Sequence, residues 1–248
     1  MRRYPSAREL SYSIGPGPAS PAVKAIIIIN VVMFLVSKFV LPGITDYLGL
    51  KPAAIFQQFR IWQPVTYLFL HGTIGHILFN MLSLWMFGTE LERRWGTQAF
   101  LRYYFATGIA AGITTILFAI LPFAITARLY DVVTIGASGA IFGLLLAYGL
   151  IFPNRTILLV VFPLPARWFV IIVGGIVLLQ AVGDTGGGVA HFAHLGGLAA
   201  GYAILRGPRV SPANEVRYRY LRWKMDKARK KFGIYSGGKR DDWDKRVH

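Results

Sequence analysis

The stretch GASGAIFGLLLAYGLIF occupies residues 136–152 and places a serine, Ser138, at the head of an otherwise apolar segment. A second apolar segment, residues 190–206, carries His191 and His194 near its beginning. Polar side chains at bilayer depth are energetically expensive and are usually kept for a function. A serine and a histidine that both begin apolar segments of this length therefore indicate a nucleophile and its base inside a membrane, and we expect hydrolysis there.

The composition of the whole chain agrees with a membrane protein. Of the 248 residues, 54% are hydrophobic and 15% are charged, and the mean hydropathy is +0.49, which leaves too little polar surface for a soluble globule. The chain contains no cysteine, which excludes a disulfide framework and a thiolate metal site.

The net charge of +16 is compatible with nucleic-acid binding, but much of it lies in a tail that begins at Gly207. The tail contains a cluster of basic residues, namely Arg217, Arg219, Arg222, Lys224, Lys227, Arg229, Lys230 and Lys231. A basic cluster that follows an apolar segment is more simply explained by anionic lipid headgroups. We therefore expect a lipid bilayer as partner, with the tail near its headgroups, and no nucleic acid.

Six apolar segments come close to the length of about 20 residues that a spanning helix needs. They lie at residues 23–40, 75–91, 98–126, 136–152, 166–183 and 190–206. The first continues apolar to Val40 without a small-x-small cleavage pattern, so it is expected to stay as a span. The sequence thus predicts an all-α membrane protein, with a six-span domain over residues 23–206 between cytoplasmic segments 1–22 and 207–248.

Two segments between the spans are expected to lie at the membrane surface. The loop over residues 41–74 carries Trp62, Tyr67 and several phenylalanines, which suits the interface. Residues 156–162 are apolar but too short to cross, and Pro163 and Pro165 end the run. We expect this second segment to be a connector on the membrane surface.

Positive charges predict the orientation. Arginines precede the first span and follow the second and the fourth, and the basic tail follows the sixth. The arginines before the tail that carry this assignment are Arg2, Arg3, Arg8, Arg93, Arg94 and Arg155. These regions are assigned to the cytoplasm, so both termini are inside and the loops with Asp46, Asp131 and Asp184 face outward. The polar residues that begin the second, fourth and sixth spans then share one level near the outer face.

Small residues predict close contact between the fourth and sixth spans. Gly139-x-x-x-Gly143 and Gly197-x-x-x-Gly201 are patterns that let helix backbones approach closely in lipid. Such contact brings Ser138 Oγ within reach of a histidine ring, at the distance of about 3 Å that a nucleophile and its base require.

Three motifs together resemble those of the rhomboid intramembrane serine proteases. They are GASG at residues 136–139, HxxxxHxxxN at residues 71–80 and AHLGG at residues 193–197. Their order and common depth make the resemblance specific, and it covers about residues 25–206, with the basic tail outside it. The resemblance implies a six-helix bundle that cleaves single-span membrane proteins near the outer face.

Carried over residue by residue, the resemblance implies a role for each polar position. Ser138 is the nucleophile and His194 the general base, while His76, Asn80 and the Ser138 backbone N–H form the oxyanion site. Some family members have a tyrosine at the position of Phe142, which stacks on the catalytic histidine. Phenylalanine keeps the ring and lacks the hydroxyl.

The chemistry is also consistent with these residue types. Amide hydrolysis needs a nucleophile, a proton shuttle and donors aimed at the oxyanion, one of which contributes about 3 kcal/mol to the reduction of the barrier. A carboxylate at mid-bilayer costs about 3 kcal/mol, so we expect a Ser-His dyad without a charged third member. We expect no cofactor and no metal. Residues 183–188, which contain three consecutive glycines just before the sixth span, are expected to form a mobile cap over a cavity that admits water.

Two alternatives stay open. The first is a non-catalytic rhomboid-like protein that binds membrane clients; such relatives typically lack the serine or the histidine. The second is a metal site formed by His71, His76, His191 and His194, against which stands the absence of a His-Glu-x-x-His pattern. His191 is expected to tie helices together. Without a Ser-rich, acid-poor transit segment, a bacterial plasma membrane is the expected location.

Overall fold

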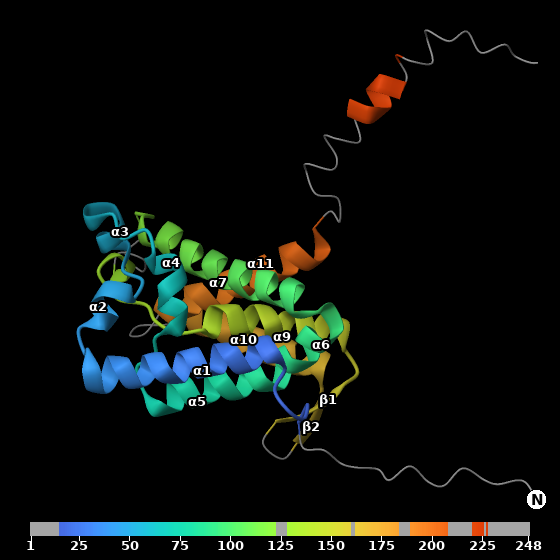
Figure 1. Ribbon diagram of the computed structural model, residues 1–248, viewed down its shortest axis with the longest axis horizontal. Coiled ribbons are helices and arrows are strands. Elements are labelled where there is room, and N and C mark those ends of the chain that lie inside the picture. Colours follow the sequence, from blue (N-terminus) through green and yellow to red (C-terminus); the bar gives the residue numbers. More distant parts are fainter. Residues whose placement is uncertain are drawn as a thin grey trace, which may run out of the picture. The chain divides into compact units, whose positions relative to one another are not determined.

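The computed structural model describes residues 15–122, 128–159, 162–183, 189–207, 220–225 and 227. The chain divides into two compact units, Met1–Leu205 and Arg206–His248. Among its described residues, the first unit is a bundle of helices with one short β-hairpin (Figure 1).

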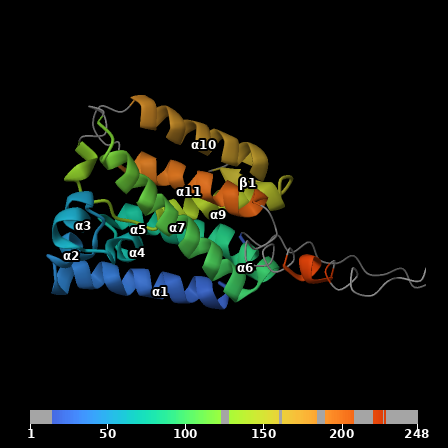
Figure 2. The same ribbon diagram turned by 90° about the horizontal axis from the view of Figure 1, so that it is seen from above.

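Long helices alternate with short helical turns along the bundle. In chain order they are α1 (Pro21–Leu35), η1 (Val36–Val40), α2 (Ile44–Leu48), α3 (Pro52–Gln58), α4 (Gln63–Thr66), η2 (Tyr67–Phe69), α5 (Ile74–Ser83), η3 (Leu84–Gly88), α6 (Thr89–Trp95), α7 (Thr97–Ala119), η4 (Arg128–Tyr130), α9 (Ser138–Ile151), α10 (Ala166–Gly183) and α11 (Val189–Arg206). α1 and α10 lie on opposite sides of the bundle, with α7, α9 and α11 between them (Figure 2). The helices that carry the predicted nucleophile and base, α9 and α11, therefore lie between α1 and α10 in Figure 2.

The last two predicted spans agree closely with helices in position. Residues 166–183 coincide with α10, and residues 190–206 differ from α11 by one residue. The third predicted span was too long, because α7 ends at Ala119 and not at residue 126. The last residues of that prediction, 123–126, lie outside the described residues, as do residues 184–188 of the expected cap.

Length and composition alone identify fewer spans than six. Among the described residues, Pro21–Val40 and Thr97–Ala119 are long and apolar enough to cross a membrane. A third candidate joins Gln63–Phe69 to Ile74–Trp95, although these two segments are bent by 97°. α9 is apolar but shorter. The chain is a helical membrane protein, and the count of six spans stays a prediction.

The connector between the fourth and fifth predicted spans is a β-hairpin that the sequence analysis did not predict. β1 (Thr156–Leu159) pairs antiparallel with β2 (Phe162–Pro165), with Thr156 opposite Pro165. An apolar backbone that is too short for a spanning helix still needs partners for its N–H and C=O groups, and the hairpin supplies them. Both strands are edge strands, which is where proline is tolerated.

Candidate active site

Ser138 is the first residue of α9, and the loop before it is held by backbone hydrogen bonds. Thr134 and Leu50 exchange two such bonds, of 2.8 and 2.9 Å, and the Gly136 N–H donates to the Tyr67 carbonyl at 2.9 Å. Because the first N–H groups of a helix have no acceptor within it, the Ser138 N–H is a donor that α9 itself leaves unused. Ser138 therefore combines its hydroxyl with a backbone donor that α9 does not use.

His194 on α11 meets this serine directly. Its Nε2 lies 2.7 Å from Ser138 Oγ, within hydrogen-bond distance. When the imidazole is neutral with its proton on Nδ1, Nε2 accepts the hydroxyl proton. The orientation of the imidazole is restricted by the Phe142 ring, which stacks on it with ring centroids 4.3 Å apart and ring planes 22° apart.

The second ring nitrogen of His194 is Nδ1. Among the described residues, Nδ1 of His194 is buried and has no hydrogen-bond partner. In a Ser-His-Asp triad this nitrogen donates to a carboxylate, which orients the ring. Here the stacked Phe142 ring restricts the orientation of the imidazole.

Four glycines set the distance between α9 and α11. A Cβ added at Gly197 would lie 2.0 Å from the Gly139 carbonyl oxygen, which is closer than any real contact. A Cβ at Gly201 would lie 3.2 Å from the Gly143 Cα and 2.6 Å from the Tyr103 hydroxyl. Side chains at these positions would push the helices apart, so the 2.7 Å Ser-His contact depends on backbone-to-backbone approach.

His76 lies against the loop that precedes the serine. Thr73 caps α5 by accepting the His76 backbone N–H at 3.1 Å, and a Cβ at Gly136 would lie 2.6 Å from His76 Nε2. The Gly72 N–H donates to His76 Nδ1 at 3.5 Å, which assigns the ring proton to Nε2 when the imidazole is neutral. The ring therefore presents an N–H donor on the side of Gly136.

Asn80 lies one turn further along the same helix. Its side-chain Nδ2 donates to the His76 carbonyl at 2.9 Å, and the side chain is buried. An amide carries two N–H donors, so one of them is left for another acceptor. His76 and Asn80 thus share a face of α5, as their spacing of four predicted.

The two remaining histidines of the predicted cluster each lie near one of the first two. The His71 ring is buried and contacts the His76 ring, with centroids 4.9 Å apart. The His191 ring lies 6.2 Å from that of His194. Within the described part of the chain, no group of three or more histidine, aspartate or glutamate side chains is placed to hold a metal ion.

Two tyrosines that the sequence analysis did not assign support the site. The Tyr67 hydroxyl donates to the Gly108 carbonyl at 2.7 Å, and the Tyr103 hydroxyl donates to the Gly143 carbonyl at 2.9 Å. Both are buried and come from elements that pack against α9. For Tyr103 the available signal is a tyrosine inside a predicted span, because a buried phenol needs a hydrogen-bond partner. Tyr67 was expected in the loop at the membrane interface, and nothing in the sequence indicated its buried contact.

Comparison with known proteins places these residues in one matched region. The family model described as "Rhomboid domain" matches residues 58–207, which contain Ser138, His194, His76 and Asn80. The chain is 33% identical over 159 residues to "Rhomboid protease GluP" of Bacillus subtilis (strain 168), a match that covers 62% of the chain and 27% of that protein.

Eukaryotic relatives match the chain as well. It is 37% identical over 150 residues to "Rhomboid protein 1, mitochondrial" of Saccharomyces cerevisiae, covering 59% of the chain and 41% of the relative. It is 36% identical over 98 residues to "Rhomboid-like protease 3" of Toxoplasma gondii, covering 40% and 34%. The matches thus span less than half the length of these three relatives. Because the family model matches more than half of this sequence, the chain belongs to the rhomboid family.

Proposed function

We propose that the chain is an intramembrane serine endopeptidase that uses Ser138 as nucleophile and His194 as general base. The observation that carries the proposal is the 2.7 Å distance between Ser138 Oγ and His194 Nε2, within a chain of the rhomboid family. A nucleophile and a base within hydrogen-bond reach, with the base held by a third group, form the arrangement required for covalent catalysis.

In the first half of the reaction, His194 Nε2 takes the hydroxyl proton as Ser138 Oγ attacks the carbonyl carbon of the scissile peptide bond. The resulting tetrahedral intermediate collapses when the C–N bond breaks, and His194 returns the proton to the leaving amine. The acyl group is left on Ser138 as an ester. In the second half, His194 removes a proton from water as the water oxygen attacks this ester. The second tetrahedral intermediate collapses when the C–O bond to Ser138 breaks and His194 gives the proton to Ser138 Oγ, which releases the carboxylic acid.

The negative charge on the carbonyl oxygen is stabilised by three donors. We assign them to the Ser138 backbone N–H, the Nε2–H of His76 and the remaining amide N–H of Asn80. These donors are fixed before the substrate binds, because Gly72 and Thr73 hold His76 and the carbonyl of His76 holds Asn80. Removal of one such donor typically lowers kcat by about 10²- to 10³-fold.

The substrates we propose are single-span membrane proteins, cut near the outer face of the membrane. The proposed topology has six spans over residues 23–206 and both termini in the cytoplasm, in the plasma membrane of a bacterium. The arginines after the second and fourth predicted spans support this orientation. The common depth of the predicted spans' polar residues supports cleavage near the outer face.

The test is the rate at which the purified full chain cleaves a fluorogenic transmembrane peptide in lipid nanodiscs. We expect Ser138→Ala and His194→Ala each to remove nearly all cleavage. Because the two groups act as one unit, the double variant should be no slower than either single variant. A chain that cleaves equally well after Ser138→Ala would refute the assignment of the nucleophile.

His191→Ala is the matched control, since it removes a second imidazole from the same end of α11. We expect it to retain much of the activity. Loss in His191→Ala together with retention in His194→Ala would reverse the assignment of the base. A chelator should leave the rate unchanged, and inhibition by a chelator would favour the alternative of a histidine metal site.

A further inference from the structure

Side chains of α4 hold the backbone of residues 47–51, which join α2 to α3. Gln63 contributes two hydrogen bonds, because it is fully buried and both ends of its amide are bonded. Its Oε1 accepts the Lys51 N–H at 3.0 Å, and its Nε2 donates to the Tyr47 carbonyl at 3.2 Å. An unpaired buried amide is costly, so these two bonds fix the segment relative to α4.

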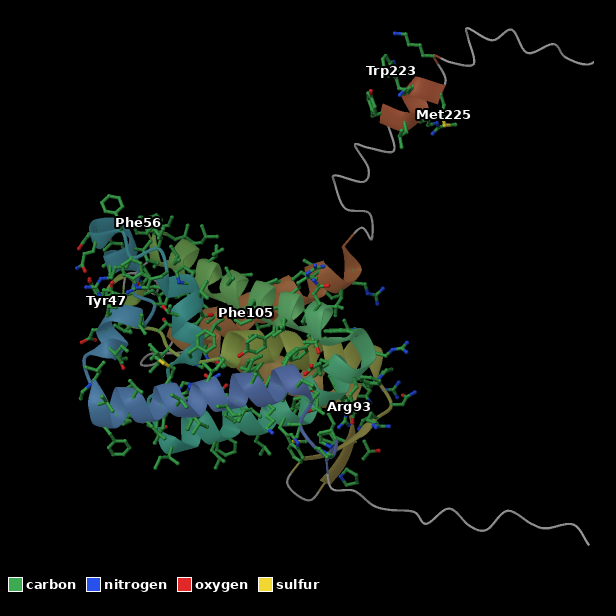
Figure 3. The ribbon with its side chains drawn as sticks, in the orientation of Figure 1. Tyr47, Phe56, Arg93, Phe105, Trp223 and Met225 are labelled. Atoms are coloured by element: carbon green, nitrogen blue, oxygen red, sulfur yellow. The ribbon has the colours of Figure 1, made fainter. Side chains whose placement is uncertain are left out.

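Thr66, at the end of α4, adds a third bond to the same segment. Its hydroxyl has one proton to donate and lies 2.6 Å from the Leu48 carbonyl and 3.3 Å from the Trp62 carbonyl, so the shorter distance assigns the proton to Leu48. α2, α3 and α4 lie together at one end of the bundle (Figure 1), where Tyr47 is labelled in Figure 3. We call residues 47–51 and 63–69 the clamp.

The loop before Ser138 is bonded to this clamp at two points. Leu50 and Thr134 exchange backbone hydrogen bonds as an isolated antiparallel bridge. Two residues further along the loop, the Gly136 N–H donates to the carbonyl of Tyr67, which directly follows α4. Because α9 begins only two residues after the second of these bonds, the clamp determines where the helix of the nucleophile starts.

Close packing accompanies this pairing. A Cβ added at Gly49 would lie 2.5 Å from Val133 Cγ1 and 3.2 Å from Ile135 Cγ2, so two side chains of the loop occupy the space beside this glycine. The clamp is also fixed to the bundle, since the Tyr67 hydroxyl donates to the Gly108 carbonyl of α7 at 2.7 Å. The loop therefore lies against a support that is attached to a long helix.

We propose that Gln63 and Thr66 are positioning residues for Ser138, acting through the clamp and the loop paired with it. The inference rests on the proposed protease function, in which Ser138 Oγ and His194 Nε2 must stay at their separation of 2.7 Å. Both residues bond to the backbone of the clamp. Loss of their bonds frees the segment that carries Leu50, and the loop then no longer holds the start of α9 in one place.

The first test compares two replacements of Thr66 in the full chain in nanodiscs. Thr66→Val has nearly the shape of threonine and lacks the hydroxyl, whereas Thr66→Ser keeps it. We expect Thr66→Val to lower kcat on the fluorogenic transmembrane peptide by about 10-fold, less than the cost of a full 1 Å misplacement. KM should stay the same, because the transition-state geometry is changed and substrate binding is not. Thr66→Ser should restore kcat to near the parental value.

The second test removes both bonds of the buried amide. Gln63→Met keeps an unbranched side chain of similar length, and we expect it to lower kcat by about 100-fold. Gln58→Met is the matched control, because Gln58 is exposed at the end of α3, and it should cleave at the parental rate. Rates are measured well below the melting temperature of each variant. If Gln63→Met does not fold, the Thr66 pair carries the test.

Hydrogen exchange measures the pairing without catalysis. The amides of Thr134 and Gly136 are hydrogen-bonded to the clamp, so they should exchange slowly in the parental chain. We expect a peptide covering residues 134–138 to exchange about 10-fold faster in both slow variants, including in a Ser138→Ala background that does not cleave. The serine replacement and the exposed glutamine variant should exchange like the parent.

Two results would overturn the proposal. One is a lower melting temperature in Thr66→Val with kcat and exchange at their parental values, which would leave the clamp a purely structural role. The other is a raised KM with unchanged kcat, which would assign the clamp to substrate binding. If the parental chain did not cleave, the protease function would be rejected, whereas the exchange rates would still show whether the clamp holds the loop. The two failures are therefore distinguishable.

Discussion

Gly136 connects the two sides of the proposed active site at the scale of a single residue. Its φ of +122° lies in a region that side chains rarely adopt, and a Cβ there would lie 2.6 Å from His76 Nε2. The backbone of the loop before Ser138 can approach the His76 ring only because this residue is glycine. The first glycine of the GASG motif is therefore required for steric reasons, in addition to the proposed chemical role of its serine.

We predict that Gly136→Ala slows cleavage by about 100-fold, because an added methyl group displaces the His76 ring or the loop, and misplacement by about 1 Å has this cost. The effect should appear in kcat, since the geometry of the transition state is changed. The measurement is the steady-state rate on a fluorogenic transmembrane peptide.

Gly75→Ala is the matched control, because a Cβ at Gly75 meets nothing within 4 Å and the residue lies beside His76. It should cleave at close to the parental rate. Equal rates for the Gly136 and Gly75 variants would show that contact between the loop and His76 is not needed.

Contact between α9 and α11 determines the site at the scale of elements. Gly197 faces the Gly139 carbonyl, and Gly201 faces both Gly143 and the Tyr103 hydroxyl. Packing is the main force between helices in lipid, so the same contacts serve stability and position the histidine relative to the serine.

We predict that Gly201→Leu lowers both the melting temperature and the cleavage rate, the latter by about 100-fold, because the larger side chain separates α9 from α11 and misplaces the base. Gly175→Leu in α10 is the control, since a Cβ there meets nothing within 4 Å. Parental melting and cleavage in Gly201→Leu would mean that close approach of these helices is dispensable.

Glu92 on α6 joins a different pair of elements. Its carboxylate accepts the backbone N–H groups of Ala22 and Val23, at 3.0 and 3.1 Å, and also the Ser20 hydroxyl. A negative charge at the first turn of α1 satisfies donors that the helix cannot satisfy itself. Thr97 at the start of α7 donates to the same carboxylate at 2.7 Å, so Glu92 ties α1 to α7.

We predict that Glu92→Gln destabilises the bundle by about 2 kcal/mol. The charged carboxylate acceptor is lost, and the buried N–H groups then have only the neutral amide side chain as a partner. The measurement is thermal unfolding in detergent. Glu90→Gln is the matched control: its ion pair with Arg155, at 3.2 Å, is partly exposed and contributes little. Similar melting of the two variants would contradict a special role for Glu92.

The segment before α1 extends this contact. Arg93 donates to the Pro16 and Pro18 carbonyls, and the Trp85 indole N–H donates to the Gly17 carbonyl at 2.9 Å. Arg93 projects at this end of the bundle in Figure 3. The arginines near Glu92 were interpreted from charge alone as markers of the cytoplasmic side, and at least one of them also binds backbone.

The proposed orientation in the membrane is a property of the whole molecule and can be tested by labelling its loops. Asp131 and Asn154 lie before and after α9, so a span formed by this helix separates them. We predict that cysteines placed at Asp131 and at Asp184 react with an impermeant thiol reagent added outside intact cells, and that a cysteine at Asn154 does not. Asp184 lies outside the described residues. Labelling at Asn154 without lysis would reverse the proposed topology.

The sequence alone predicted the positions of the three helices α9, α10 and α11. The apolar segments at residues 136–152, 166–183 and 190–206 correspond to α9, α10 and α11 with differences of at most two residues. The length of an apolar segment depends only on consecutive residues and must match the thickness of the bilayer, which is why such segments can be identified from the sequence. The same reasoning identified Ser138 and His194, because polar groups stand out in such segments.

Only the tertiary structure decided which groups meet. Nothing in the sequence chooses between His191 and His194 by geometry, yet His194 Nε2 lies 2.7 Å from Ser138 Oγ, and this position depends on glycine contacts between two helices. The bond from Tyr103 to Gly143, the approach of His76 to Gly136 and the β-hairpin were not predicted either. Periodicity determines what each segment is, whereas the depth and rotation of one helix against another depend on side chains from distant parts of the chain packing together.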